Sequence, residues 1–374
     1  MNTTTQANEL PRGRVVSIDV LRGFDMFWII GGGTFFGSVF KLIDSPIART
    51  LERQLHHAAW HGFHFEDLIF PLFLFIVGLS LPFALKKRID RGDSRGDILC
   101  HVLKRTAILY FLGLVYYGFF DLNFGELRYV GVLQRIALCY FFASLIVLHS
   151  GMRGQAIWTV SLLVFYWLAI TFIPVPGYGA GFIAREPLEG NLVGFFDRMV
   201  LPGSLYMKVF DPEGLLSTIP AVSTTLLGVL SARLLSASMT ETRKVAVLSF
   251  AGIASLVLGL VWGMVFPINK YLWTSSFVLF AGGWSMLLLA LFYWIVDVKG
   301  YQRWAFPFVI IGLNPITIYV ASRFINFTEL GDIFVHGFAR YSGDFQPVIV
   351  AAAGIIVQLL FLYFLYRKKL FLKA

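Results

Sequence analysis

Charged residues are scarce in this chain. Of its 374 residues only 14% are Asp, Glu, Lys or Arg, whereas 57% are hydrophobic and 17% are aromatic. A soluble globular domain carries nearer a quarter charged residues. The composition therefore excludes an ordinary soluble protein and indicates a polytopic membrane protein.

Cysteine is also scarce, since Cys100 and Cys139 are the only two and no CxxC motif occurs. This excludes a disulfide framework and a cysteine-rich structural zinc site. The N-terminal segment MNTTTQANELPRGR lacks an apolar core followed by a small-residue cleavage site. We therefore expect the first apolar run to be a retained helix rather than a signal peptide.

Long apolar runs dominate the rest of the chain. A helix needs about 20 mostly apolar residues to cross the hydrocarbon core. Ten stretches qualify, namely 16–40, 67–85, 106–121, 130–149, 156–174, 219–236, 245–266, 274–296, 305–323 and 347–366. No linker, strict repeat or low-complexity run divides them. The sequence predicts an all-α, polytopic helical bundle of about ten transmembrane helices, with residues 1–374 as a single integral membrane domain.

The distribution of Lys and Arg predicts the orientation. With the N-terminus placed in the cytoplasm, 20 of the 31 basic residues fall in inside segments, seven of them in the 86–105 loop. The positive-inside rule then places both termini in the cytoplasm. Topology and contact with anionic lipid account for the net charge of +9, and nothing in the sequence supports nucleic-acid binding. Three long loops, 41–66, 175–218 and 324–346, are expected outside.

Four histidines precede the second apolar run, in the stretch HHAAWHGFHFEDL. On a helical backbone His57, His61 and His64 would lie on one face. Three interpretations follow. The histidines are ordinary interfacial residues, or they bind a metal with Glu66 or Asp67. In the third, one of them is a general base or nucleophile that Asp67 or Glu66 orients.

Polar residues interrupt several apolar runs. Asp19 and Arg22 stand at i and i+3 and are expected to pair on one helix face, either as a structural ion pair or for function. Arg135 lies next to Gln134. Its charged guanidinium is energetically costly near the membrane and fits an anionic ligand. Asn314 precedes a proline, where a helix break frees backbone groups to line a cavity.

Two outside segments add further polar groups on the same face as the histidines. FDPEGLLSTIPA carries Asp211 and Glu213, which could simply be carboxylates at a helix start. PINKYLWTSS carries Asn269, Lys270 and Trp273, and a tryptophan beside hydrogen-bonding groups is either a sugar platform or an interfacial anchor. Their convergence on one face indicates a site.

Seven motifs together resemble the heparan-α-glucosaminide N-acetyltransferase family, and in particular its bacterial members. They are SIDVLRGFDM, HHAAWHGFHFEDLIFPLFLFIVGLSL, GVLQRIALCYF, FDPEGLLSTIPA, PINKYLWTSSF, WIVDVKG and GLNPITIYV, in that order. The resemblance runs from about residue 14 to 323. The frame H-A-x-W-x-G-x-x-x-x-D-L-x-F-P selects His57, Trp60 and Asp67. Where the family has an asparagine before the glycine run, this chain has Ile29 and Ile30.

The resemblance implies a multi-pass acyltransferase of the bacterial inner membrane. It would move an acetyl group from cytoplasmic acetyl-CoA to the amino group of glucosamine, or of a glucosamine-containing saccharide, at the periplasmic face. His57 would act as base or acyl carrier, oriented by Asp67. The residues expected to contact acetyl-CoA are Arg22, Gln134, Arg135, Asn314 and Ser275. The residues expected to hold the acceptor are Trp60, Asp211, Glu213, Asn269, Lys270 and Trp273.

Two other functions stay open. The first is an inner-membrane transporter of N-acetylglucosamine or a related amino sugar, and the second is a metal-dependent hydrolase. The leading interpretation needs no metal. Its expected partners are acetyl-CoA, the amino-sugar acceptor and membrane lipid, without nucleic acid, and a homodimer is one assembly to test.

Overall fold

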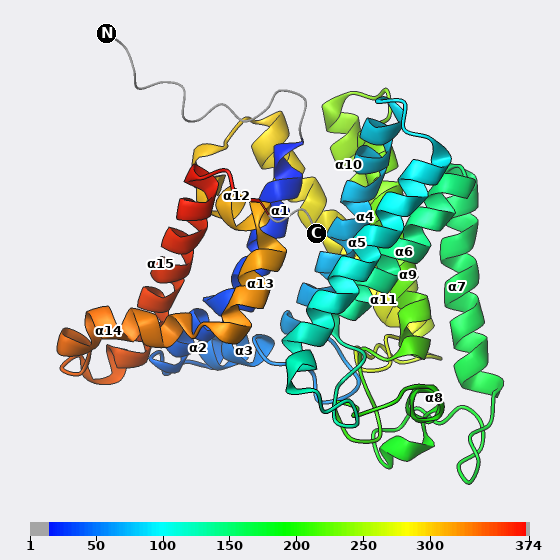
Figure 1. The fold of residues 1–374 in the computed structure, drawn as a ribbon, viewed down its shortest axis with the longest axis horizontal. Helices are drawn as coiled ribbons and strands as arrows, with labels where there is room; N and C mark the ends of the chain where they lie inside the picture. Colours follow the sequence, from blue (N-terminus) through cyan, green and yellow to red (C-terminus); the bar gives the residue numbers. More distant parts are fainter. Residues whose placement is uncertain (1–14, 372–374) are drawn as a thin grey trace.

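Long helices form nearly all of the structure (Figure 1). The computed structural model describes residues 15–371, and within that range there is no β-strand. Eight helices are long and apolar enough to cross a membrane. They are α4 (Glu66–Ile89), α5 (Arg95–Tyr116), α6 (Val132–His149), α7 (Met152–Phe172), α9 (Leu215–Leu235), α10 (Glu241–Gly263), α11 (Ser275–Phe292) and α15 (Gln346–Arg367). The prediction of an all-α polytopic bundle is confirmed.

One further pair of helices is apolar enough to form a broken span or a re-entrant loop. Helices α12 (Phe306–Leu313) and α13 (Pro315–Phe324) meet at an angle of 65° on either side of Asn314. Asn314 has φ −131° and ψ 46°, outside the helical region, and the following proline cannot donate a backbone hydrogen bond. The helix therefore breaks at the asparagine that the sequence singles out.

The prediction of one helix over residues 16–40 is wrong. Helix α1 (Val16–Phe27) leads into a π-helical turn at Trp28–Gly32, and α2 (Gly33–Lys41) then continues in a new direction. Figure 1 shows α1 running along the other spanning helices, whereas α2 and α3 (Pro46–Gln54) lie across their lower ends. Gly31 is where the helical geometry is interrupted, with φ 161° and ψ −13°, whereas Gly32 and Gly33 keep helical angles.

The predicted start of the third helix is also wrong, because α5 begins at Arg95 rather than 106. Ser94 accepts a hydrogen bond from the backbone of Asp97, and Asp97 accepts one in return from the backbone of Ser94. This capping box satisfies donors at the helix start. The basic segment 86–105 is consequently mostly helical.

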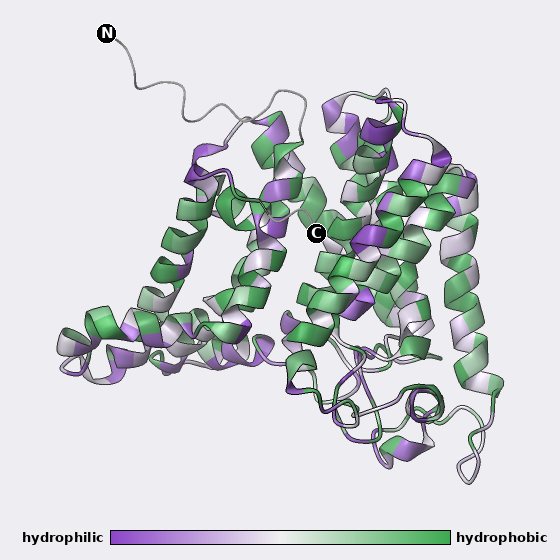
Figure 2. Ribbon diagram, in the orientation of Figure 1, coloured by the Kyte–Doolittle hydropathy of each residue, from purple (hydrophilic) through white to green (hydrophobic). Residues whose placement is uncertain are grey.

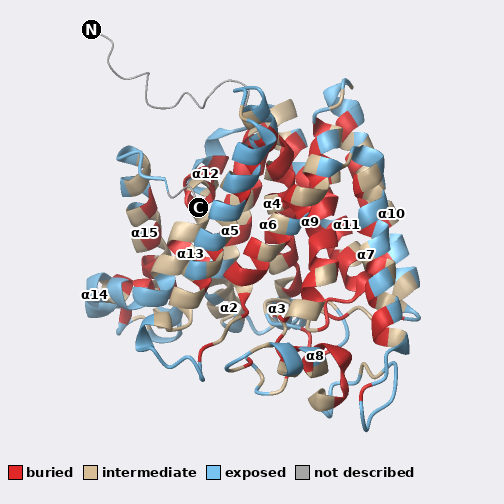
Figure 3. Ribbon diagram, turned by 45° about the vertical axis from the view of Figure 1, so that its right-hand side comes forward, coloured by how far each residue is buried: buried red, intermediate tan, exposed pale blue. Residues whose placement is uncertain are grey.

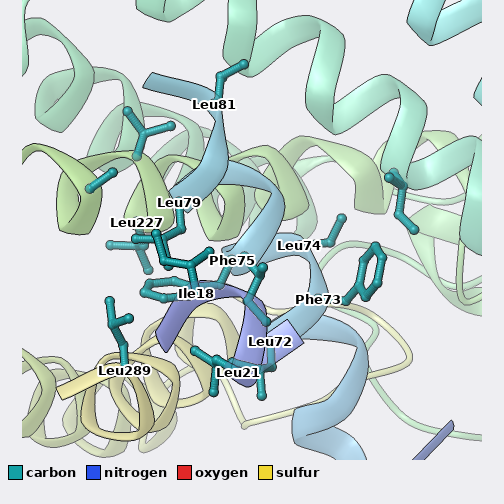
Figure 4. Packing of buried hydrophobic residues seen from close by; sticks show 14 of the residues in the cluster. Ile18, Leu21, Leu72, Phe73, Leu74, Phe75, Leu79, Leu81, Leu227 and Leu289 are labelled. Carbon is teal, nitrogen blue, oxygen red and sulfur yellow. The ribbon is translucent and has the colours of Figure 1, made fainter. Parts of the chain in front are cut away.

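Helices α4 and α9 form the centre of the bundle (Figure 3), and α1, α6 and α11 surround them. A Cβ atom on Gly78 would lie 1.8 Å from the carbonyl oxygen of Thr225, so the backbones of α4 and α9 are in contact. Leu72, Phe75 and Leu79 of α4 pack against side chains from α1, α9 and α11 (Figure 4).

The two ends of the bundle are more polar than its middle (Figure 2). The lower end in Figure 1 carries α8 (Leu192–Val200), α14 (Phe327–Ala339) and the loop between α3 and α4. The upper end carries the turn between α4 and α5. The N-terminal segment, with Arg12 and Arg14, and also Lys373 lie outside the described residues.

Candidate active site

The loop 55–65, between α3 and α4, is organised around Asp67. One carboxylate oxygen of Asp67, Oδ2, accepts hydrogen bonds from the backbone N–H groups of Ala58 at 3.1 Å and His64 at 2.9 Å. The other, Oδ1, lies 2.9 Å from Nδ1 of His57. Because Gly62 has φ 120°, a value that L side chains rarely adopt, the loop is not helical. The four histidines therefore do not share a helix face.

His57 stands at the edge of this loop with 41% of its side chain exposed, whereas Asp67 is only 1% exposed. An Nδ1–H group that faces the carboxylate leaves Nε2 as the nitrogen with a free lone pair. Lys270 lies beside it, with Nζ 2.9 Å from Nε2 and 3.1 Å from Nδ1. The arrangement can remove a proton from a group that approaches Nε2.

A second loop, 264–274, brings Lys270 to this position. The backbone N–H of Gly62 donates to the carbonyl of Ile268 at 2.9 Å, which ties the two loops together. Asn269 shapes the turn, because its side-chain oxygen accepts from the backbone of Leu272 and its own N–H donates to Thr274 Oγ1. Its side-chain nitrogen lies 3.3 Å from Nδ1 of His61.

The remaining histidines have other partners. Burial lowers the pKa of His61. Nδ1 of His64 lies 2.7 Å from the carbonyl oxygen of His56, and the His56 ring lies 2.9 Å from Glu52. Among residues 15–371 no three His, Cys, Asp or Glu side chains are grouped as metal ligands.

The two predicted tryptophans are both buried. Trp60 donates from Nε1 to the carbonyl of Ile183 at 2.9 Å and stacks on Tyr271 with ring centroids 5.3 Å apart. Trp273 is 1% exposed and donates to Thr224 Oγ1 at 3.2 Å. A fully covered indole has no open face for a sugar, so its burial argues against the predicted platform. That acceptor role stays a prediction.

Asp211 and Glu213 are paired with a residue that the sequence did not single out. Arg128 donates to both oxygens of Asp211, at 2.7 and 2.6 Å, and to Glu213 at 2.5 Å. The side chain of Asp211 is completely buried. Two neighbouring carboxylates need a cation, and Arg128, a basic residue in the loop before α6, was the sequence signal for one. Their predicted contact with the acceptor stays untested.

Arg135 and Gln134 lie deeper, at the start of α6. The Arg135 guanidinium is 4.9 Å from the centroid of the Trp273 ring and donates to Gly214 and Ser217. Within the described structure its Nε and Nη1 atoms have no hydrogen-bond partner, and neither has the Gln134 side chain. Buried polar groups are normally paired. These two fully buried residues therefore carry polar atoms that no neighbour within the described structure satisfies.

A basic cavity of about 470 Å³ opens at the opposite, upper end of the bundle. Arg22 lines it and also donates to Ser80 Oγ at 2.6 Å. The other cationic or imidazole side chains in its wall are Lys87, Arg88, Arg91, His101 and Arg105. Such a wall is suited to phosphate groups.

A small apolar cavity of about 20 Å³ adjoins it and shares Phe73, Ile136 and Ile316 with its lining. Phe70 lines the small cavity and contacts Trp273, with ring centroids 5.3 Å apart. The small cavity is lined by Leu133 and Ile136, which flank Gln134 and Arg135 in α6, whereas Arg135 and His57 line neither cavity.

Two other residues that were predicted to contact acetyl-CoA, Ser275 and Asn314, line neither of these two cavities. Ser275 donates to the carbonyl of Leu163 at 2.7 Å, so it joins α11 to α7 and lines neither cavity. Asn314 donates to the carbonyl of Leu370 at 3.2 Å, although its neighbours Leu313 and Pro315 line the basic cavity.

The apolar helices and the polar groups at their ends define a polytopic α-helical membrane protein. The chain is 27% identical over 419 residues to the heparan-alpha-glucosaminide N-acetyltransferase of Homo sapiens, covering 96% of this chain and 60% of that protein. It is 28% identical over 372 residues to the Mus musculus protein of the same name, covering 85% of this chain and 56% of the relative. These similarities confirm the resemblance to the heparan-α-glucosaminide N-acetyltransferase family.

Residues 14–122 also match a family model described as a domain of unknown function, DUF5009. That segment includes α1, the histidine loop, α4 and α5. The chain spans 60% or less of the length of the two named relatives.

Proposed function

We propose that the protein is a transmembrane acetyltransferase of the bacterial inner membrane. It takes the acetyl group of acetyl-CoA at the cytoplasmic end and transfers it to the amino group of glucosamine, or of a saccharide containing it, at the periplasmic end. One observation carries the proposal: the His57–Asp67 pair stands at the opposite end of the bundle from a cavity walled by Arg and Lys. The names of the two relatives add to it.

Acetyl-CoA would enter from the basic end. Its phosphate groups would bind the cationic wall, with charge-assisted hydrogen bonds. Its pantetheine arm would point toward the apolar cavity beside Phe70, which must widen to admit it because its volume is only about 20 Å³. Gln134 and Arg135 would stabilise negative charge on the thioester oxygen, because Nε2 of Gln134 and the Nε and Nη1 atoms of Arg135 are buried and have no hydrogen-bond partner within the described structure.

His57 would act at the other end. Asp67 holds Nδ1, and Nε2 accepts a proton from the acceptor amine as nitrogen attacks the acetyl carbon. The CoA thiolate leaves and is then protonated by His57. A variant of this route, in which His57 itself carries the acetyl group, uses the same nitrogen. Lys270 would contact the acceptor, whereas Trp60 and Asn269, which are buried, would support the loops around it.

Purified protein in lipid nanodiscs would be given acetyl-CoA labelled in the acetyl group together with glucosamine. We expect labelled N-acetylglucosamine from the wild type and a loss of about 10²-fold or more in His57→Ala. His56→Ala is the matched control, since its ring contacts Glu52 instead of Asp67. Equal rates in both variants would contradict the role of His57.

An assay in sealed vesicles distinguishes the proposed acetyltransferase from a sugar transporter. The 65° bend between α12 and α13 is a feature that transporters also show. Protein in sealed vesicles should acetylate glucosamine on one side with acetyl-CoA supplied only on the other. Uptake of N-acetylglucosamine in the absence of acetyl-CoA, without any product formation, would favour the transporter.

A further inference from the structure

Lys270 has an unusual place in the candidate site. Its ammonium nitrogen lies 2.9 Å from Nε2 of His57 and 3.9 Å from Oδ1 of Asp67. Only 16% of its side chain is exposed. The hydrogen bond from the backbone N–H of Gly62 to the carbonyl of Ile268 holds the loop of Lys270 against loop 55–65. A primary amine of the chain itself therefore stands where the amine of an acceptor must come.

We propose that Lys270 is a self-acetylation site: when no sugar is bound, the protein transfers an acetyl group to Nζ of Lys270 and so blocks its own acceptor site. This inference rests on the proposed acetyl transfer. It extends that function, because the acceptor becomes a residue of the protein and the product is an inactive form.

The chemistry is that of the proposed reaction. The neutral Lys270 amine attacks the carbonyl carbon of the thioester, and one N–H proton passes to Nε2 of His57. The C–S bond then breaks, and the CoA thiolate leaves and takes the proton from His57. An amide on Lys270 and free CoA result, so no further reactant is needed.

Two properties of Lys270 favour this step. Burial lowers its pKa, against the opposing effect of Asp67, Glu213 and Glu66, so more of the side chain is the neutral, nucleophilic amine. Nζ is nearly equidistant from both ring nitrogens of His57, which places it over the face of the imidazole. A small rotation of the flexible lysine stem brings Nζ into line with Nε2.

Acetylation would remove the positive charge and add a bulky amide beside Nε2. The site would then be occupied at the position where a substrate amine donates its proton. A bound sugar would displace Lys270 and protect it. The modification should thus accumulate when acetyl-CoA is abundant and the acceptor is absent.

The test is mass spectrometry of the full chain in nanodiscs after incubation with ¹³C-acetyl-CoA and no sugar. We expect label on the Lys270 peptide to grow with time, to fall about 10²-fold in His57→Ala, and to fall with saturating glucosamine. Lys41, whose side chain is 70% exposed, is an internal control that should show only slow labelling independent of His57.

Activity provides a second readout. Preincubation with acetyl-CoA should reduce glucosamine acetylation by the wild type. Lys270→Arg, whatever its activity relative to the wild type, should show the same rate with and without preincubation. If glucosamine is acetylated but Lys270 carries no more label than Lys41, the self-acetylation is wrong and the proposed function stands. If neither is acetylated, the proposed function fails and the self-acetylation fails with it.

Discussion

Asp67 joins the fold to the candidate chemistry through His57, whose Nδ1 lies 2.9 Å from one carboxylate oxygen. The other oxygen binds two backbone N–H groups of the same loop. A single buried carboxylate therefore contacts both the backbone of the loop and the imidazole of His57.

We expect Asp67→Asn to reduce acetyl transfer by about 10²- to 10⁴-fold while the protein still folds. The amide oxygen of asparagine can replace the oxygen that accepts from the loop, but its NH₂ group would face His57 and favour the wrong tautomer. Steady-state rates and the thermal melting curve in detergent measure the two effects. Asp44→Asn, at a side chain that is 96% exposed, is the control and should change neither.

The sequence indicated that His57 and Asp67 lie close together, but not how the loop between them folds. The spacing between His57 and Asp67 was sufficient to pair them, because both lie on one short segment. The loop conformation depends on Gly62 and on two backbone hydrogen bonds to Asp67, which a periodicity argument does not include. Hence the expectation of a common helix face for the histidines did not hold.

Long-range contacts were the main limit. The contact of Lys270 with His57 joins residues 213 positions apart, and the contact of Asp211 with Arg128 joins residues 83 positions apart. The positive residues of the segment 86–105 were explained by topology and contact with anionic lipid, although Lys87, Arg88, Arg91 and Arg105 line a cavity. Charge patterning predicts a side of the membrane, whereas a cavity depends on how helices pack.

Arg105 is suited to a test of the acetyl-CoA route. Its guanidinium lies 4.6 Å from the Tyr140 ring centroid, and its buried Nε has no partner among residues 15–371. Arg105→Gln should raise KM for acetyl-CoA about tenfold or more, as expected for a lost charge-assisted hydrogen bond, with little change in KM for glucosamine. Arg95→Gln, in the same helix but outside the cavity wall, should leave both constants unchanged. If Arg105→Gln and Arg95→Gln changed KM for acetyl-CoA equally, the basic cavity would not be the acetyl-CoA site.

Arg128 should matter for stability. Its side chain is 11% exposed, and removing its charge leaves the carboxylates of Asp211 and Glu213 without their cation. Breaking a buried ion pair in this way costs about 3–5 kcal/mol, so Arg128→Gln should melt well below the wild type in detergent. Arg49→Gln breaks a pair of similar length, 2.6 Å, whose side chains are 66% and 96% exposed. An effect within about 0.5 kcal/mol is expected there.

Asp197 should make the stability depend on pH. Its Oδ1 accepts from the backbone of Leu215 at the start of α9, and it faces Arg135 and Asp211. Burial raises the pKa of Asp197 to about 7 from an ordinary value of 3.8. The folded protein therefore keeps a proton that the unfolded chain releases, and the stability this confers is complete below about pH 4 and is lost as the pH rises to about 7.

Asp197→Asn removes this titration and retains an oxygen for Leu215. The variant should match the wild type near pH 4 and exceed it at pH 8, by at most roughly 4 kcal/mol. Chemical denaturation in detergent between these pH values measures the difference. A gap that is constant with pH, or a wild type that gains stability relative to the variant toward pH 8, would show that Asp197 is already ionised in the folded protein at low pH.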